Sequence, residues 1–463
     1  MPNKEEEKKK TDLVIGCILA LALLVRMIAI NQSFWLDEAI NVTAARDRGF
    51  TDLILNYTKG DFHPPLYHII LWLWLKAVPV SEMSARLPSV VFGVLTVWVV
   101  YKIGQKLWKE NASFARLAAL FLATSGLHVY YSQEARMYAL AALTTASAVL
   151  TLLNLRKDSS RKNKLLFLSS FVLMLLSDYQ PWLLLPFFFV VTPGMTALAL
   201  FLLFPWWPML AEQVRQGITT AANFPAWGEV VGGLTLKSAL LVPVKFLVGR
   251  VSIDNNLLYA LVLSLPTVVA GLGLARTLME KGKHLHVIKG WLAVPLAAGA
   301  LVGLKVPIFS YFRFLFVLPA FYLMLSYGLG KFRFIFRGPL IAILLLTNII
   351  STAAYLGIAR FHREDWRSAA SFVFVFKDQS LVLFPNLAQA AGFEFYNNGK
   401  VKVEDPSTLN LHNNPKHVFL VKYVAEIFDP KDLLVETLND NGYQKTEEKG
   451  FNGVLVWHYE LKP

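Results

Sequence analysis

Hydrophobic residues in this chain come in long blocks, not at the spacing of a single helix face or strand face. Blocks of about 15 to 20 apolar residues suit helices that cross the hydrocarbon core of a membrane. Backbone groups in lipid need internal hydrogen-bond partners, so each block is predicted to be helical. We expect about eleven spans. They are Leu13–Ile30, Leu87–Leu107, Phe114–Tyr131, Ala139–Leu155, two within Leu165–Val191, Thr196–Leu210, Leu257–Ala275, Gly290–Leu304, Leu315–Gly330 and Pro339–Gly357.

One apolar block, Leu66–Val78, is too short to cross. A helix rises about 1.5 Å per residue, so this block reaches about 20 Å, against a hydrocarbon core of about 30 Å. Pro64 and Pro65 precede it and suit the start of a helix. We expect a helix that lies at the membrane interface or dips into it, and Lys237–Val248 is a second candidate of this kind.

The basic residues predict the orientation. Lysines at the N-terminus precede the first span, and further lysines and arginines gather in 156–164, 276–289 and 331–337. Such clusters favour the cytoplasmic side. The expected protein is a multi-pass plasma-membrane protein with a cytoplasmic N-terminus and an extracytoplasmic C-terminus.

The composition supports this class. Of 463 residues, 55% are hydrophobic and 17% are charged, whereas soluble domains carry about a quarter charged residues. The net charge of +13 is assigned to lysines and arginines that anchor cytoplasmic loops. Nucleic acid is not expected as a partner, because the soluble part has no basic stripe with interleaved aromatics. The single cysteine, Cys17, lies in the first span and leaves no intrachain disulfide.

From about Arg360 the long apolar blocks stop. SLVLFPN, HVFLVKYV and GVLVWHYEL have the length and β-branched content of strands, while Leu387–Phe395 and Pro430–Asn441 are predicted helices. The predicted fold is therefore a polytopic α-helical membrane protein with a small C-terminal α/β domain on the outer face. We expect a transmembrane domain over 1–358, with an outer loop at 31–86, and a soluble domain over 359–463.

Two adjacent carboxylates, Asp37 and Glu38, follow the first span in the sequence NQSFWLDEAI. Neighbouring residues on a helix point about 100° apart, so the pair cannot face one point as a symmetrical dyad. A division of roles is expected, in which one carboxylate deprotonates an acceptor hydroxyl and the other holds a cation. The alternative is a solvated pair at a helix start, where carboxylates are favoured.

His63 lies in the same loop, beside the two prolines. It could donate to a phosphate, bind a metal or cap the helix; an ordinary interfacial histidine is the alternative. Asp61, His63 and His68 do not form a recognised metal-ligand spacing. We assign no metal ligands and no certain cofactor, and leave a divalent metal open.

Polar residues also gather at two later outer boundaries. SQEARMY contains Gln133, Glu134, Arg136 and Tyr138, and KVPIFSYFRF contains Lys305, Tyr311 and Arg313. Arginine binds phosphate in a bidentate manner, and lysine binds it as a point charge. These cations could seat an anionic lipid headgroup. They could instead snorkel, cap helices or compensate local carboxylates.

Nucleotide-binding and common hydrolase motifs such as GxGxxG, Walker A, GxSxG, HExxH and CxxC are not found in the sequence. A glycosyl transferase of this composition would therefore take its sugar from a lipid rather than from a nucleotide.

Several short motifs, in this order, resemble one family. They are WLDEA, HPPLY followed by ARLPS, SQEARMYAL, a late Tyr-Phe-Arg before the tenth span, and REDWRSAA at Arg363–Ala370. Together they resemble the GT-C membrane glycosyltransferases, in particular dolichyl-phosphate-mannose–protein mannosyltransferases and the aminoarabinose transferases that modify lipid A. The stretch SDYQ differs from the family, which often has a His-Tyr pair where Asp178 and Tyr179 stand here.

The resemblance implies transfer from a polyprenyl-phosphate sugar to a hydroxyl acceptor on protein, lipid or envelope glycan, with inversion at the anomeric carbon. It implies a hexosyl or pentosyl transferase that works at the outer membrane face. Asp37 matches the family's acidic residue and is the expected general base, supported by Glu38.

Further site residues come from the resemblance and from the two polar clusters at the outer boundaries. Those expected to bind the donor phosphate are Arg136, Arg313, Lys305 and His63. Those expected to line the substrate site are Gln133, Glu134, Tyr138 and Tyr311. The expected partners are thus the lipid-linked sugar, the hydroxyl acceptor and membrane lipid.

Two other classes stay open. A lipid or solute transporter should carry ionisable groups near mid-span and often a repeated half, whereas here charges gather at the outer boundaries. The third class is an inactive membrane scaffold that binds through its outer domain.

Overall fold

The computed structural model describes residues 4–109, 111–223, 232–376, 379–409, 411 and 415–462. The chain folds into two compact units. The first, here called the membrane unit, comprises Met1–Ile30, Phe50–Trp74 and Arg86–Gly357. The second, here called the sheet unit, comprises Asn31–Gly49, Leu75–Ala85 and Ile358–Pro463. Residues 224–231 lie outside the described part of the chain.

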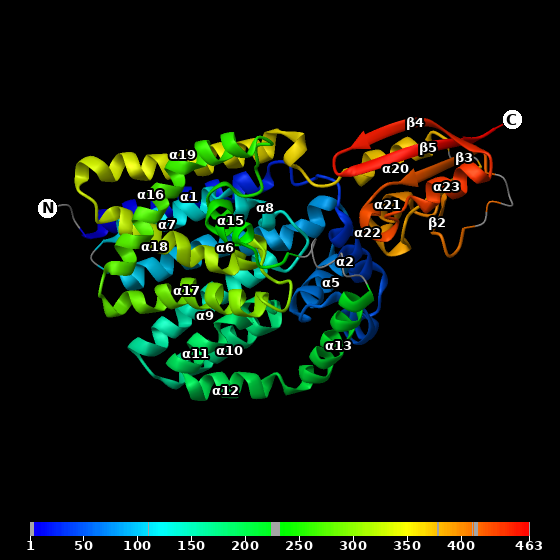
Figure 1. Ribbon diagram of the computed structural model, residues 1–463. Coiled ribbons are helices and arrows are strands. Elements are labelled where there is room, and N and C mark those ends of the chain that lie inside the picture. The colour runs from blue at the N-terminus through cyan, green and yellow to red at the C-terminus, as the bar shows by residue number, and fades with distance from the viewer. Residues whose placement is uncertain are drawn as a thin grey trace. The chain divides into compact units, whose positions relative to one another are not determined.

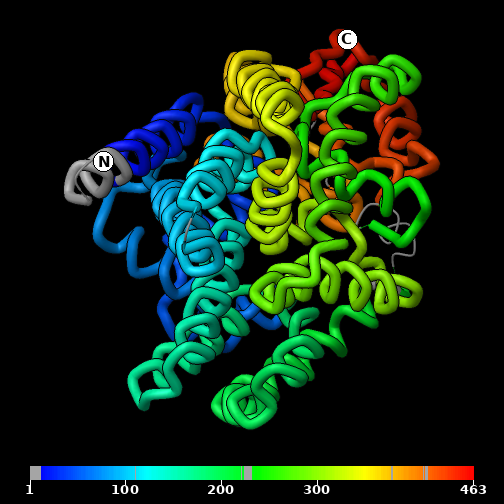
Figure 2. The backbone as a smooth tube through the Cα atoms, turned by 90° about the vertical axis from the view of Figure 1, so that its left-hand side faces the viewer, coloured from blue at the N-terminus to red at the C-terminus, as the bar shows by residue number. Residues whose placement is uncertain are grey.

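The membrane unit is helical, and several of its long helices run side by side (Figure 1); Figure 2 views them nearly end-on. Its helices are α1 Lys4–Met27, α3 Phe50–Asp52, α4 Thr58–Asp61, α5 Leu66–Ala77, α6 Glu82–Leu107, α7 Ala112–Thr124, α8 Gly126–Ser132, α9 Tyr138–Lys157, α10 Arg161–Ser177, α11 Leu185–Val191, α12 Pro193–Leu202, α13 Trp207–Asn223, α15 Leu236–Val248, α16 Asn256–Met279, α17 His286–Gly303, α18 Leu318–Gly330 and α19 Phe334–Gly357. The end of α5 and the start of α6 fall within Leu75–Ala85 and are counted with the sheet unit. A π-helical turn spans Leu53–Tyr57, and 3-10 turns span Gln180–Leu184, Phe204–Trp206, Lys283–Leu285 and Tyr311–Val317.

Within the described residues, six helices are long and apolar enough to cross a membrane, or up to eight if two bent pairs each count as one span. The count of about eleven is therefore not confirmed, although the helical membrane fold is. The bent pairs are α7 with α8, at 60°, and α12 with the helical stretch Phe204–Thr220, which contains most of α13, at 48°. Within Leu165–Val191, where two spans are predicted, the helix is interrupted at SDYQPW, because α10 ends at Ser177 and the next turn begins at Gln180.

The bend between α7 and α8 leaves the last carbonyls of α7 without partners in their own helix, which is costly in an apolar environment. Side chains from elsewhere take their place. Asn348 donates to the Phe121 carbonyl at 3.0 Å, and Thr352 donates to the Thr124 carbonyl at 2.8 Å. The guanidinium of Arg26 donates to the Ala123 carbonyl at 3.2 Å. The break is thus built into the packing of α1, α7 and α19.

Helix α18 packs against α7, α16 and α17 and is buried along almost its whole length. Gly328 on α18 faces Gly273 on α16, and a Cβ at Gly328 would come within 1.9 Å of the Gly273 carbonyl oxygen. Thr277 on α16 donates to the Met324 carbonyl at 2.7 Å. Small residues let membrane helices approach closely, and this contact is an example.

The sheet unit contains a five-stranded mixed sheet in the order β2-β1-β3-β5-β4. Pairs β1–β2 and β1–β3 are parallel, and β3–β5 and β5–β4 are antiparallel. The strands are β1 Ser380–Leu383, β2 Lys402–Glu404, β3 His417–Val421, β4 Tyr443–Phe451 and β5 Val454–Leu461. Strands β1, β3 and β5 fall in the three predicted segments, and β2 and β4 are additional.

Helices cover both faces of this sheet (Figure 1). Apolar residues of α20 (Trp366–Phe374) and α21 (Ala391–Asn397) pack on one face with Phe419 and Val456. Leu434 and Leu438 of α23 (Leu433–Asp440) pack on the other. A short helix, α22, spans Ala425–Phe428. Helix α2 (Leu36–Asp47), from the first loop, packs against α21.

Candidate active site

The predicted carboxylate pair lies in the first turn of α2, in the sheet unit. Glu38 is fully buried, whereas Asp37 is partly exposed. The two side chains therefore have different surroundings. This is the divergence expected of adjacent residues on a helix.

Glu38 forms a buried ion pair with Arg363. Its Oε2 lies 3.2 Å from Nε of Arg363, and the two side chains are 0% and 1% exposed. A buried carboxylate is tolerated when a cation and hydrogen bonds compensate its desolvation. Glu38 thus anchors α2 to the segment that opens the C-terminal part of the chain.

Glu364 receives three donors at the start of α2. Its Oε2 accepts from the Leu36 backbone N–H at 3.2 Å and from Nε1 of Trp366 at 2.8 Å, and its Oε1 accepts from the Tyr423 hydroxyl at 2.7 Å. Burial raises the pKa of Glu364; these hydrogen bonds oppose that shift and the nearby Asp37 carboxylate adds to it. Burial, with Glu364 and Asp37, also raises the pKa of Tyr423. Asp37 is therefore an electrostatic neighbour of both groups.

Arg367 and Tyr396 fix the loop that precedes α2. Arg367 donates to the Asn31 carbonyl at 2.8 Å and to Oε1 of Glu82 at 2.5 Å. The Tyr396 hydroxyl donates to the same Glu82 oxygen at 2.8 Å and accepts from the Phe34 N–H at 2.9 Å. Side chains of the REDWR sequence thus support the loop that precedes α2. The position of REDWR in the sequence did not predict this role.

In the membrane unit, Asp61 brings two histidines together. His68 donates from Nε2 to Oδ2 of Asp61 at 2.8 Å, His63 donates from Nδ1 to the same oxygen at 3.0 Å, and the Tyr57 hydroxyl donates to Oδ1 at 3.2 Å. Burial raises the pKa of Asp61, but His68 and His63 outweigh it and hold the pKa well below its usual value. His63 is thereby fixed by a carboxylate next to the Pro-Pro turn.

A chain of hydrogen bonds joins this loop to the SDYQPW turn. Nε2 of Gln213 donates to the Thr58 carbonyl at 2.6 Å and to the His63 carbonyl at 3.1 Å. The Tyr179 hydroxyl donates to Oε1 of Gln213 at 2.5 Å and accepts from Nε1 of Trp206 at 2.9 Å. Sequence reasoning did not assign Gln213 to the site, because an isolated glutamine carries no recognisable signal.

Asp178 connects His63 to one of the predicted cations. It is buried, and burial raises its pKa, while His63, a backbone hydrogen bond and Arg313 oppose that shift. His63, Asp178 and Arg313 are therefore electrostatic neighbours. This acid stands where the resembled family often has a histidine.

Arg136 and Arg313 approach the same group of aromatic rings. The Arg136 guanidinium lies 5.8 Å from the Tyr138 ring centroid, and the Arg313 guanidinium lies 5.8 Å from that of Phe312. The two rings meet edge-to-face at 5.9 Å. Such contacts hold guanidinium groups over the faces of aromatic rings. Two cations far apart in the sequence are thus brought close together.

Two further cations, Lys245 and Arg250, extend this cluster and were not predicted. Nζ of Lys245 donates to the Val251 carbonyl at 3.0 Å and lies 6.0 Å from the Tyr311 ring centroid. Arg250 donates to the Tyr131 hydroxyl at 3.5 Å, and Tyr131 stacks on Phe312 at 6.1 Å. Burial and the nearby Arg250 lower the pKa of Lys245 to about 8.

The remaining predicted residues differ in their surroundings. Gln133 donates to the Arg26 and Ile28 carbonyls at 2.9 and 2.6 Å and accepts from the Tyr355 hydroxyl at 2.8 Å, so its amide is engaged in tying helices together. Glu134 is fully buried. Lys305 is exposed.

The comparisons with known proteins agree with this fold. A family model described as dolichyl-phosphate-mannose-protein mannosyltransferase matches residues 62–211. A search of curated protein sequences found no match.

Solved structures match over nearly the whole chain. ArnT from Cupriavidus metallidurans in the apo state has a TM-score of 0.59 at 12% identity, covering 96% of this chain and 97% of that one. The same protein bound to undecaprenyl phosphate has a TM-score of 0.57 at 11% identity, with the same coverage. The Archaeoglobus fulgidus oligosaccharyltransferase AglB, in complex with an inhibitory peptide and a dolichol-phosphate, has a TM-score of 0.52 at 12% identity, covering 97% of this chain and 74% of that one. These matches agree with the predicted resemblance to the GT-C membrane glycosyltransferases, and they confirm a helical membrane fold with a small C-terminal sheet domain.

Proposed function

We propose that the protein transfers a sugar from a polyprenyl-phosphate carrier to a hydroxyl acceptor at the outer face of the membrane. The observation that carries the proposal is the contrast between the two adjacent carboxylates. Glu38 is buried against Arg363, and Asp37 is partly exposed. The first suits a structural anchor, and the second suits a group that meets substrate.

Asp37 acts as the general base in this proposal. It takes the proton from the acceptor hydroxyl as the oxygen attacks the anomeric carbon, and the bond from that carbon to the donor phosphate oxygen breaks. The configuration is inverted because one displacement takes place. Three donors to Glu364, one of them the Leu36 N–H, hold the first turn of α2 in place. A base must be fixed within hydrogen-bond reach of its proton.

Arg136 and Arg313 bind the donor phosphate. Their contacts to the Tyr138 and Phe312 rings orient the guanidinium groups. Arg250 and Lys245 extend the same cationic group, and His63 and Asp178 lie beside Arg313. The leaving group is a lipid phosphate, so fixed cations rather than a proton donor stabilise the charge that develops.

The compared proteins support the choice of donor. ArnT was solved with undecaprenyl phosphate and AglB with a dolichol-phosphate, and the matching family model is named for a dolichyl-phosphate sugar. We infer the same chemical class of carrier here, a polyprenyl phosphate. The acceptor is a hydroxyl on protein, lipid or envelope glycan.

The experiment is a transfer assay with the full-length protein in lipid nanodiscs and polyprenyl-phosphate-linked sugars of several kinds, each radiolabelled. Arg313→Ala is expected to raise the KM for donor at least about tenfold. Arg215→Ala is the matched control, since Arg215 is an exposed arginine of the same unit paired with Glu212, and it should leave the KM unchanged. Equal donor KM values in both variants would remove Arg313 from the phosphate site, and a wild-type protein that transfers none of the sugars would contradict the function.

A further inference from the structure

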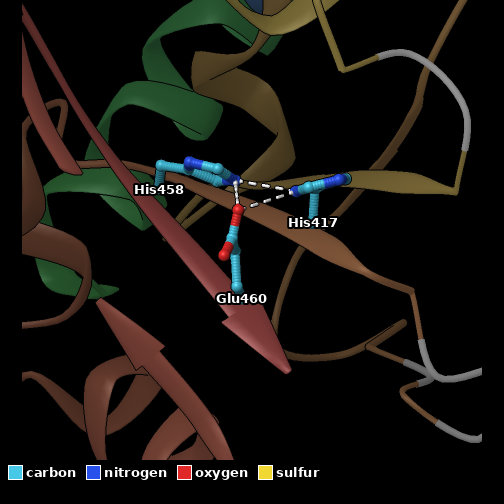
Figure 3. Close-up of side chains that lie close together, drawn as sticks. All are labelled: His417, His458 and Glu460. Carbon is cyan, nitrogen blue, oxygen red and sulfur yellow. Dashed lines mark hydrogen bonds and ion pairs between the residues drawn. The ribbon is translucent and has the colours of Figure 1, made fainter. Parts of the chain in front are cut away.

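Three side chains of the metal-ligand type meet on one face of the sheet (Figure 3). His417 lies on β3, and His458 and Glu460 lie on β5. Alternate residues of a strand share a face, so His458 and Glu460 point the same way. His417 is paired directly opposite Glu460 in the antiparallel register. The strand pairing therefore accounts for the cluster.

The ligand atoms have the spacing of a metal coordination shell. Nδ1 of His417 lies 3.0 Å from Nε2 of His458 and 3.5 Å from Oε1 of Glu460, and the last two atoms are 3.8 Å apart. Ligands about 2.0–2.2 Å from a tetrahedral zinc ion are themselves about 3.3–3.6 Å apart. One ion can reach all three atoms with only small side-chain shifts.

The surroundings orient the inner histidine. The His458 ring stacks on Phe419 with centroids 4.5 Å apart and planes at 6°. Its Nδ1 lies 3.3 Å from Oγ1 of Thr446 on β4, which leaves Nε2 facing the cluster. A hydrogen bond to the remote ring nitrogen is the usual device that fixes a ligating histidine.

We propose that His417, His458 and Glu460 bind one divalent ion of the zinc class. Two imidazoles and one carboxylate form a ligand set that zinc takes in proteins, with a fourth position left for water or an anionic group. The Glu460 side chain is 45% exposed, so this position faces solvent. The ion joins β3 to β5 and stabilises the sheet unit, and its binding does not depend on the proposed sugar transfer.

The test is metal binding by the full-length protein in detergent, stripped with a chelator and then titrated with Co²⁺ as a spectroscopic probe and with Zn²⁺. The wild type should develop the visible absorption of a Co²⁺ ion with nitrogen and oxygen ligands, which Zn²⁺ displaces. His417→Gln and Glu460→Gln should each weaken this binding at least about tenfold. Two conservative variants are used because His458 is buried and its replacement could unfold the domain.

Glu448→Gln is the matched control, since Glu448 is an exposed carboxylate on the neighbouring strand β4. It should bind both metals like the wild type. Metal bound at other sites contributes equally to the wild type and to each variant, so it does not affect the difference between them. The proposal is overturned if His417→Gln and Glu460→Gln bind as the control does, or if the wild type binds neither metal, in which case the cluster is a histidine hydrogen-bond pair beside an acid.

Discussion

Glu38 is engaged in a buried ion pair with Arg363, which leaves its neighbour Asp37 as the carboxylate proposed to meet substrate. Its carboxylate is fully buried and is compensated by the Arg363 guanidinium at 3.2 Å. Removing one partner of a buried pair leaves a desolvated charge, which costs about 3–5 kcal/mol. The same change at an exposed pair costs about 1 kcal/mol or less.

We therefore expect Glu38→Gln to lower the stability of the sheet unit by several kcal/mol, because Arg363 loses its counter-charge. Asp47→Asn, at the exposed Arg46–Asp47 pair of the same helix, should change it by about 1 kcal/mol or less. Thermal unfolding of the purified protein in detergent measures both. Equal shifts for the two variants would contradict a structural role for Glu38.

Asp61 makes the stability of the folded protein depend on pH in the acid range. His68 and His63 hold its pKa below the usual value, which is about 3.9 in an unfolded chain. A depressed pKa in the folded state contributes stability that is complete above about pH 4 and is lost as the pH falls through the folded value. Asp61→Asn should therefore destabilise the protein at pH 7 and flatten its loss of stability between about pH 4 and pH 2.

Unfolding temperatures between pH 7 and pH 2 check this expectation. Asp158→Asn serves as control, because Asp158 is exposed and accepts hydrogen bonds from Ser160 and Asn163 rather than from histidine. An Asp61→Asn protein with the same acid slope as this control would remove Asp61 from the acid transition.

At the scale of elements, the contact of α16 with α18 depends on the absence of side chains. A Cβ on Gly328 would come within 1.9 Å of the Gly273 carbonyl oxygen, so Gly328→Ala must push two helix backbones apart. We expect a loss of at least about 2 kcal/mol. Gly271→Ala, on α16 with nothing within 4 Å of its Cβ position, should stay within about 1 kcal/mol of wild type. Thermal unfolding separates the two, and an unchanged Gly328→Ala protein would refute the close packing.

The elements also show what a sequence can and cannot predict. The apolar blocks predicted α6, α9, α16 and α19 well, because an apolar run of this length is typical of a membrane-spanning helix. The bend after Thr124 was missed, since the groups that cap it, such as Asn348 and Thr352, lie far along the chain. Strand β4 was missed because its exposed QKTEEKG sequence shows no apolar face.

In the candidate site, too, local patterns could be predicted from the sequence and contacts between distant segments could not. Asp37, Arg136 and Arg313 were proposed from the sequence because charged residues at predicted outer boundaries are conspicuous. Lys245 and Arg250 were not, because their place in the cluster comes from contacts with tyrosines of distant segments. The partner of Glu38 likewise lies beyond the whole membrane unit in the sequence.

At the scale of the molecule, the unit that carries Asp37 is assembled from three separate stretches of chain. Asn31–Gly49 and Leu75–Ala85 fold with the C-terminal residues, and the REDWR segment provides hydrogen bonds and an ion pair that hold the first of them. Acceptor activation is thus proposed for a base on a supported helix turn, and donor binding for cations in the membrane unit. In this division of roles, the acceptor is activated by Asp37.

The most direct test is the rate of sugar transfer by Asp37→Asn at saturating donor and acceptor, in nanodiscs. Replacing a general base by its isosteric amide should lower the rate at least about 100-fold, while the unfolding temperature and donor binding stay as in wild type. Asp47→Asn, at the exposed end of the same helix, should transfer sugar normally. A fully active Asp37→Asn protein would contradict the proposed role of Asp37 as the general base.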